Sequence, residues 1–171
     1  FFPLLRQQLG LQRFVLLGHS VGGGMAVNIA AESGSDCLAL ITVSAQAFVE
    51  QQTLDGIRSA QQQFRDPQQF GRLQKYHGDK ANRVLNAWID TWLNPAFANW
   101  SLAPQLPRVM CPLLAIHGEF DEYGDQRQPQ MLVEHSGGPA RLEIMRDTGH
   151  IPHREQPQRL LQLVADFIAG I

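Results

Sequence analysis

The sequence is organised around one pattern, G-x-S-x-G, centred on Ser20 at the end of an apolar run. Residues 13–19 (RFVLLGH) predict a strand buried on both faces, and residues 21–33 predict a helix. A glycine on each side of Ser20 permits a tight, strained turn between them. Such a turn lifts the serine hydroxyl above the sheet and points the helix N-terminus, which favours negative charge, at the same place. Ser20 is therefore the candidate nucleophile.

The remaining apolar runs predict an α/β fold with a parallel sheet and flanking helices. Residues 37–43 (CLALITV) form a second strand, so strand, helix and strand make a right-handed βαβ unit. Strand character returns at 112–117 (PLLAIH) and 141–145 (RLEIM). The expected additional helices lie at 2–9, 128–135 and 156–169.

The middle of the chain, residues 45–107, contains no strand-like run and is rich in glutamine. Its best predicted helix is 79–93, with Asp79 as the N-cap and one broad apolar face. We interpret this segment as a helical cap inserted between two parts of a core, 1–44 and 108–171. The residues expected to break its helices are Gly56, Pro67, Gly71, Gly78 and Pro95.

Composition excludes several classes of partner. The net charge of -2 and the pI near 6.3 give no reason to expect binding to nucleic acid or to an anionic membrane. No apolar run approaches the roughly 20 residues that cross a bilayer. Cys37 and Cys111 each precede an apolar run, and we expect two reduced core thiols, with neither a disulfide nor a reactive thiol, in the cytoplasm. The cysteines and histidines do not show a spacing typical of metal ligands, so neither a metal site nor a cofactor is expected.

Two further motifs each follow a predicted strand downstream of Ser20. The motif G-x-x-D, ending at Asp121, follows 112–117, and the motif D-x-G-H, ending at His150, follows 141–145. Together with the pattern around Ser20, they resemble the α/β-hydrolase superfamily, whose chain order is serine, acid, histidine. The resemblance implies that Ser20 attacks, that His150 is general base and then acid, and that Asp121 orients the imidazole.

Each assignment has rivals nearby. Asp121 ranks first because it holds the G-x-x-D position, ahead of Glu122, which is second, and of Glu119 and Asp125. The rival of His150 is His153, in a pattern H-x-P-H-x-E-x-P that is familiar in the superfamily with the first histidine catalytic and the second structural. His19, beside the nucleophile, is expected to pack under the turn.

The resemblance also implies an oxyanion hole and a substrate pocket. The amide of Val21, next to the nucleophile, is one expected oxyanion donor, and family members draw the second from a loop that precedes the nucleophile strand. Several residues are candidates for the pocket but are equally compatible with core or rim positions: Met25, Phe120, Tyr123 and Ile151 beside the triad, and Trp88 and Trp92 in the cap.

The implied function is hydrolysis of a small acyl substrate. A serine nucleophile, where dehalogenases and epoxide hydrolases of this fold use aspartate, favours esters, thioesters, lactones, amides or activated C–C bonds. The alternatives are a ligand sensor built on the same fold and an inactive truncated fragment. Family members carry further strands before this point, so we expect this chain to be the C-terminal part of a hydrolase, with weak or no activity by itself. The strand before Ser20 would then be an exposed edge.

Overall fold

The computed structural model describes residues 2–171, and contacts between residues divide the chain into two compact units. One unit combines the chain up to Ala47 with Ser101–Ile171, and the other is Phe48–Trp100. The first unit carries Ser20, Asp121 and His150, whereas all three tryptophans belong to the second.

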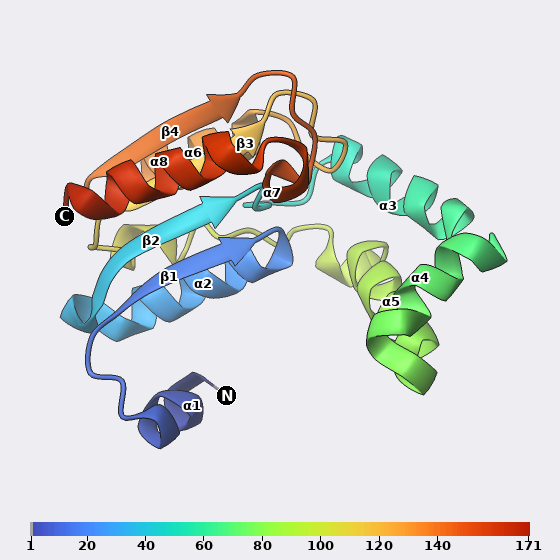
Figure 1. Cartoon of the computed structure of the whole chain (residues 1–171), viewed down its shortest axis with the longest axis horizontal. Helices are drawn as coiled ribbons and strands as arrows, with labels where there is room; N and C mark the ends of the chain where they lie inside the picture. Colours follow the sequence, from blue (N-terminus) through green and yellow to red (C-terminus); the bar gives the residue numbers. More distant parts are fainter. Residues whose placement is uncertain (1) are drawn as a thin grey trace. The chain divides into compact units, whose positions relative to one another are not determined.

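Four parallel strands, in the order β1-β2-β3-β4, form the sheet that the described residues contain in the first unit (Figure 1). In register, Leu17 lies opposite Ile41, and Ile41 lies opposite Leu114. The predicted parallel sheet is confirmed, with strand ends within one residue of those expected. The strands are β1 (Phe14–His19), β2 (Cys37–Val43), β3 (Leu113–Gly118) and β4 (Ala140–Met145).

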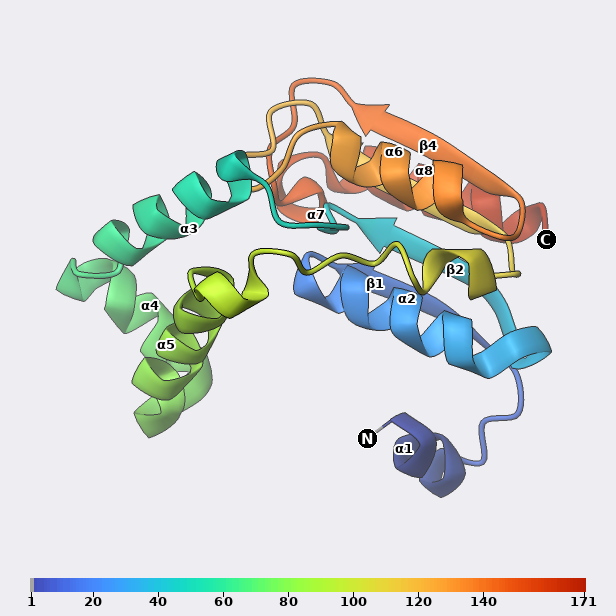
Figure 2. The ribbon, with the colours of Figure 1, turned by 180° about the vertical axis from the view of Figure 1, so that it is seen from behind.

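Helices cover both faces of this sheet (Figures 1 and 2). Helices α2 and α6 lie on one face and α8 on the other, where Leu163 packs against Ile41, Val43 and Leu114. This apolar layer holds the sheet in place, because the buried side chains of neighbouring strands and α8 share it. The helices of this unit are α1 (Phe2–Leu9), α2 (Val21–Ser33), α6 (Arg127–His135), α7 (Pro152–Glu155) and α8 (Pro157–Ala169).

Two strands that look alike in sequence differ in burial. Every residue of β3 is buried, as expected for a central strand. In β1 the exposed and covered positions alternate, and the side chain of Leu17 is 56% exposed. The prediction that β1 is buried on both faces is therefore wrong. The reason is its place in the sheet: β1 pairs with β2 alone among the described strands, so the expected exposed edge is found.

The second unit consists mainly of helices, and two of the three glycines expected to break them do not, whereas the third, Gly78, ends α4 as its C-cap with φ 54°. Gly56 lies within α3 and Gly71 within α4, contrary to prediction. An isolated glycine costs a helix only about 1 kcal/mol relative to alanine, which an amphipathic face that packs can offset. Pro67 does bound a helix, since it is the first residue of α4, with Asp66 as the N-cap. The helices are α3 (Gln51–Gln63), α4 (Pro67–His77) and α5 (Ala81–Trp92).

Details of this unit correct and extend the prediction. Asp79 is not the N-cap of α5, because it lies in a short 3-10 turn (Gly78–Lys80) that precedes the helix. The rings of Trp92 and Trp100 are 5.6 Å apart and edge-on, and both contact Phe97, so these aromatics form a small core. Action of this unit as a substrate cap stays a prediction. Across the described residues, no helix is both long and apolar enough for a membrane span.

Candidate active site

The turn between β1 and α2 has the strained geometry that its sequence predicts. Ser20 adopts φ 55° and ψ -125°, in a region that side-chain-bearing residues rarely occupy. Backbone hydrogen bonds hold it there: the Ser20 amide donates to the Val43 carbonyl at 2.9 Å, and the Ser20 carbonyl accepts from the Gly23 amide at 2.9 Å. We call residues 18–23 the elbow.

Two glycines of the elbow have no room for a side chain, and one of them, Gly23, lies outside the G-x-S-x-G motif. A Cβ on Gly18 would lie 2.2 Å from the carbonyl oxygen of Gly22, and one on Gly23 would lie 2.4 Å from the Cβ of Ala45. A Cβ on Gly22 would meet no atom within 4 Å. The close turn therefore requires Gly18 and Gly23, whereas the expectation that Gly22 provides needed space is wrong.

Ser20, His150 and Asp121 form one continuous chain of hydrogen bonds. His150 Nε2 lies 2.9 Å from Ser20 Oγ, and His150 Nδ1 lies 2.9 Å from both carboxylate oxygens of Asp121. Since the carboxylate only accepts, Nδ1 carries the proton and Nε2 is free to accept from the serine hydroxyl. Asp121 follows β3 and His150 follows β4, so the carboxyl ends of three parallel strands bring the three side chains together.

The loop that carries His150 is held by two carboxylates. The amides of Gly149 and Ile151 donate to the two oxygens of Glu155, at 2.6 and 2.9 Å. The amide of His150 itself donates to Glu122 Oε2 at 3.3 Å. We call these two glutamates the carboxylate clamp. Charge-assisted bonds of this kind are roughly twice as strong as neutral ones, so the clamp fixes the backbone from which the imidazole projects.

The acid loop is bound closely to the histidine loop. The amides of Glu119 and Phe120 donate to the carbonyls of Met145 and Thr148, at 2.9 and 2.8 Å. A Cβ on Gly118 would lie 2.1 Å from the Gly149 carbonyl oxygen, so the two loops approach as closely as a glycine allows. The position of Asp121 and the position of His150 are therefore fixed together.

Asp121 itself is buried, with its side chain fully enclosed. The amide of Tyr123 donates to its Oδ1 at 2.9 Å. His117, also buried, donates from Nε2 to the Gly124 carbonyl at 2.8 Å, and this same nitrogen lies 3.6 Å from Asp121 Oδ2. The carboxylate thus accepts hydrogen bonds from the Tyr123 amide and from the His150 ring.

The other histidines lie beside His150 rather than in its place. His19 Nε2 donates to the His150 carbonyl at 2.7 Å, so it joins the elbow to the histidine loop. Burial lowers the pKa of His19, which favours the neutral ring. The ring of His153 packs edge-on against that of His19 at 4.9 Å. Of the two candidate histidines, His150 is therefore the one that contacts Ser20 and Asp121.

Two of the pocket candidates adjoin the hydrogen-bonded chain. The ring of Tyr123 lies 4.6 Å from that of His150, and burial raises the pKa of Tyr123, so its phenol stays protonated. Ile151 lies in the clamped loop. Met25 and Phe120 are exposed, and Trp88 and Trp92 belong to α5. A role in binding substrate stays a prediction for all six, as does the role of Val21 as an oxyanion donor.

Sequence reasoning assigned no role to Glu155 or to Gln46. Gln46 is buried, and its Oε1 lies 3.5 Å from Ser20 Oγ. It follows β2, just as Ser20 follows β1 and Asp121 follows β3. A polar residue after a buried parallel strand was the available signal, because ligands of open α/β sheets bind at the carboxyl ends of the strands.

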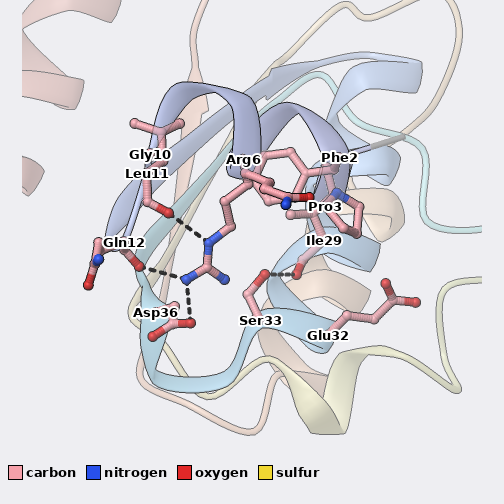
Figure 3. A pocket seen from close by; sticks show the side chains of 11 residues that line it. Phe2, Pro3, Arg6, Gly10, Leu11, Gln12, Ile29, Glu32, Ser33 and Asp36 are labelled. Atoms are coloured by element: carbon pink, nitrogen blue, oxygen red, sulfur yellow. Dashed lines mark hydrogen bonds and ion pairs between the residues drawn. The ribbon is translucent and has the colours of Figure 1, made fainter.

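A cavity of about 680 Å³ lies away from these residues, between α1 and the end of α2 (Figure 3). Arg6 projects into it, but its guanidinium already donates to the carbonyls of Leu11 and Gln12, at 2.8 and 2.9 Å, and pairs with Asp36 at 2.6 Å. Its positive charge is therefore already paired. The cavity wall also includes Phe2, Pro3, Ile29, Glu32 and Ser33.

Comparison with known proteins identifies relatives of the chain. The family model described as alpha/beta hydrolase fold matches residues 2–157. A mouse protein named serine hydrolase BPHL is 27% identical over 178 residues, which cover 96% of this chain. The chain spans 57% of the length of that relative.

Solved structures agree on the fold. A membrane phospholipase A, described as a bacterial virulence factor, superposes with a TM-score of 0.77 at 22% identity, covering 97% of this chain and 60% of the other. A proline iminopeptidase from Mycobacterium smegmatis gives a TM-score of 0.70 at 21% identity, covering 99% and 69%. At such low identity these likenesses concern the arrangement of strands and helices.

Proposed function

The chain belongs to the alpha/beta hydrolase fold family, and from that premise we propose that it is a serine hydrolase acting through Ser20, His150 and Asp121. The observation that carries the proposal is the unbroken hydrogen-bond chain from Asp121 through His150 to Ser20, with each contact 2.9 Å long. The substrate class is a small ester, thioester, lactone or activated C–C compound, because a serine nucleophile forms an acyl-enzyme with each of these.

The first half-reaction follows from the positions of the protons. His150 Nε2 takes the proton of Ser20 as Oγ attacks the substrate carbonyl, and a tetrahedral oxyanion forms. Asp121 retains the hydrogen bond to Nδ1–H and stabilises the imidazolium. The amide of Val21, at the first position of α2, has no partner within its helix and is available to the oxyanion.

The remaining steps complete acylation and then return the enzyme to its starting state. The imidazolium of His150 gives its proton to the leaving alkoxide, thiolate or carbanion, and the bond to the acyl carbon breaks. A water molecule then gives a proton to His150 and attacks the acyl-enzyme, and Ser20 leaves with the proton restored. These steps need side chains and water alone.

A fluorophosphonate probe tests the nucleophile in the full-length protein. We expect covalent labelling that is abolished by Ser20→Ala and by His150→Ala. Ser33→Ala is the matched control, because its hydroxyl bonds to the Ile29 carbonyl within α2 and should leave labelling unchanged. Labelling that survives Ser20→Ala, or no labelling at all, would contradict the proposal.

Turnover identifies the substrate class and separates an enzyme from a sensor. A panel of p-nitrophenyl esters, lactones and vinylogous diketones should contain at least one substrate, and Ser20→Ala should lower kcat about 10⁴-fold or more. Ligand-dependent binding of a partner without turnover would instead favour a ligand sensor. The cytoplasmic location inferred from the two cysteines stays a prediction.

A further inference from the structure

The two cysteines of the chain meet at the opposite end of the sheet from the triad. Cys37 is the first residue of β2, and Cys111 lies two residues before β3. Their sulfur atoms are 3.6 Å apart. The neighbouring backbone is fixed, because the Leu40 amide donates to the Pro112 carbonyl at 2.9 Å. The contact is therefore imposed by two adjacent, hydrogen-bonded strands.

The surroundings of this pair suit two thiols and no metal. The two sulfurs lie within hydrogen-bond reach of each other, and Cys37 Sγ also lies 3.4 Å from the Ala39 carbonyl. Both residues are buried, with Cys37 3% and Cys111 8% exposed. Among the described residues, no group of three or more His, Cys, Asp or Glu side chains could hold a metal ion, so the sulfurs are not part of such a cluster.

We propose that Cys37 and Cys111 are an oxidation site, at which hydrogen peroxide converts the two thiols into a disulfide that joins β2 to β3. The sulfurs are already in contact, and an approach of about 1.5 Å brings them to bonding distance. The proposal does not depend on hydrolase activity, because neither cysteine takes part in the triad.

The chemistry balances with one equivalent of peroxide. The Cys111 thiolate attacks one peroxide oxygen, the O–O bond breaks, and the departing hydroxide takes up a proton to leave as water. The resulting sulfenic acid is attacked by the sulfur of Cys37, and a second water leaves as the S–S bond forms. Two thiols and one peroxide thus give one disulfide and two waters.

Cys111 is the first of the two to react. Its hydrogen bond with Cys37 lowers the pKa of Cys111 and raises the pKa of Cys37, because the remaining thiol stabilises one thiolate and a second would be buried beside it. Cys111 is also the more exposed. A buried sulfur admits a small oxidant more readily than a bulky one, so hydrogen peroxide should act faster than oxidised glutathione.

A disulfide between Cys37 and Cys111 would also affect the stability of the fold. The two cysteines are 74 positions apart, and the loop between them contains all of Phe48–Trp100. A disulfide that closes so long a loop removes much of the freedom of the unfolded chain. Oxidation should therefore stabilise the first unit while leaving the residues of the triad untouched.

Peptide mapping of the full-length protein tests the site. After hydrogen peroxide and then alkylation, we expect a linked peptide pair that contains Cys37 and Cys111 and has lost two hydrogens. The Tm should rise by about 5–10 °C and return on reduction. The matched variants Cys37→Ala and Cys111→Ala should each lose the linked pair and the rise in Tm, and dimedone should trap a sulfenic acid on Cys111 in Cys37→Ala.

Three results would overturn the proposal. Both cysteines could remain open to alkylation after peroxide under denaturing conditions. Oxidation could stop at sulfinic acid with no cross-link, or cross-links could form only between molecules. Peptide mapping of the unmutated protein decides among these outcomes even where a variant fails to fold.

Discussion

The elbow and the histidine loop each carry a catalytic candidate and each contain a strained residue, but they are built in opposite ways. The elbow is local: within six residues, Gly18 lets its strand pass against the start of its own helix. The histidine loop is assembled from distant parts of the chain. Glu155 and Glu122 accept hydrogen bonds from its amides, and Gly118 allows the acid loop to approach it closely.

The difference shows two means of holding an unfavourable conformation. Ser20 has φ 55° and Asp147 has φ 53°, so each site contains a residue in the left-handed region. At the elbow the absence of side chains permits the geometry. At the histidine loop a charged acceptor holds the strained residue, because Glu119 Oε2 accepts from the Asp147 amide at 3.1 Å. A substitution at the elbow should therefore act through a steric clash, whereas a substitution at the histidine loop should act through loss of order.

Gly18→Ala should give the largest effect. Its Cβ would lie 2.2 Å from the Gly22 carbonyl oxygen, so the elbow must open, and we expect the free energy of unfolding to fall by about 3 kcal/mol. Gly22→Ala is the matched control, because its Cβ would meet nothing within 4 Å and alanine favours the helix. Urea denaturation measures both, and equal losses would contradict the steric account.

Glu155→Ala should affect the rate more than the stability. Without this acceptor the amides of Gly149 and Ile151 no longer hold the imidazole in place, and we expect kcat to fall about 10–100-fold with KM little changed. Glu155→Gln, which keeps one acceptor oxygen, should recover part of the loss. Glu134→Gln, at an exposed position of α6, controls for the removed charge.

A purely structural role for Glu155 gives a different result. In that case the rate per active site, counted by covalent labelling of Ser20, would match that of the parent protein. Only the Tm would fall. Steady-state kinetics normalised to labelled sites separates the two roles.

His19, which connects the two sites, should give the smallest effect. Its pKa is lowered from the ordinary 6.5 by burial, so below about pH 6.5 the unfolded chain binds the proton more readily than the folded protein. This contribution to stability is complete above that pH and is lost as the pH falls. His19→Gln should lessen the loss of stability between pH 7.5 and 5.5 by less than about 1 kcal/mol.

The measurement for His19 is urea denaturation at several pH values. The exposed His135, changed to glutamine, should leave the pH dependence as it is in the parent. A parallel pH dependence in His19→Gln and the parent would show that burial of this ring is not linked to proton uptake.

The sequence could predict what is local and contiguous. The apolar runs located the strands, and the motif around Ser20 indicated the turn, because all the residues concerned are neighbours in the chain. The prediction failed where tertiary packing overrides local preference, as for Gly56 and Gly71, which lie within helices. The prediction that Leu17 is buried was wrong because a residue pattern does not indicate how many neighbouring strands a strand has.

The supporting groups of the site were beyond prediction for a related reason. Glu155 and Glu122 act through folded loops, and no spacing in the chain specifies which amide each will reach. The contact between Cys37 and Cys111 likewise depends on the pairing of β2 with β3 across 74 positions. The motifs named the reacting side chains but not what holds them.

Two backbone hydrogen bonds bring the ends of the helical segment 48–100 together, and one of them runs from the Val49 amide to the Trp100 carbonyl at 3.3 Å. The Leu102 amide donates to the Ala47 carbonyl at 2.7 Å, and the Ala47 amide donates to Gln128 Oε1 at the same length. A segment that leaves and rejoins its host at one point can be exchanged without altering the host, since the entropy of closing the loop grows only slowly with its length. We therefore expect residues 48–100 to be an exchangeable module, through which evolution or a protein engineer can change this segment while the sheet is retained.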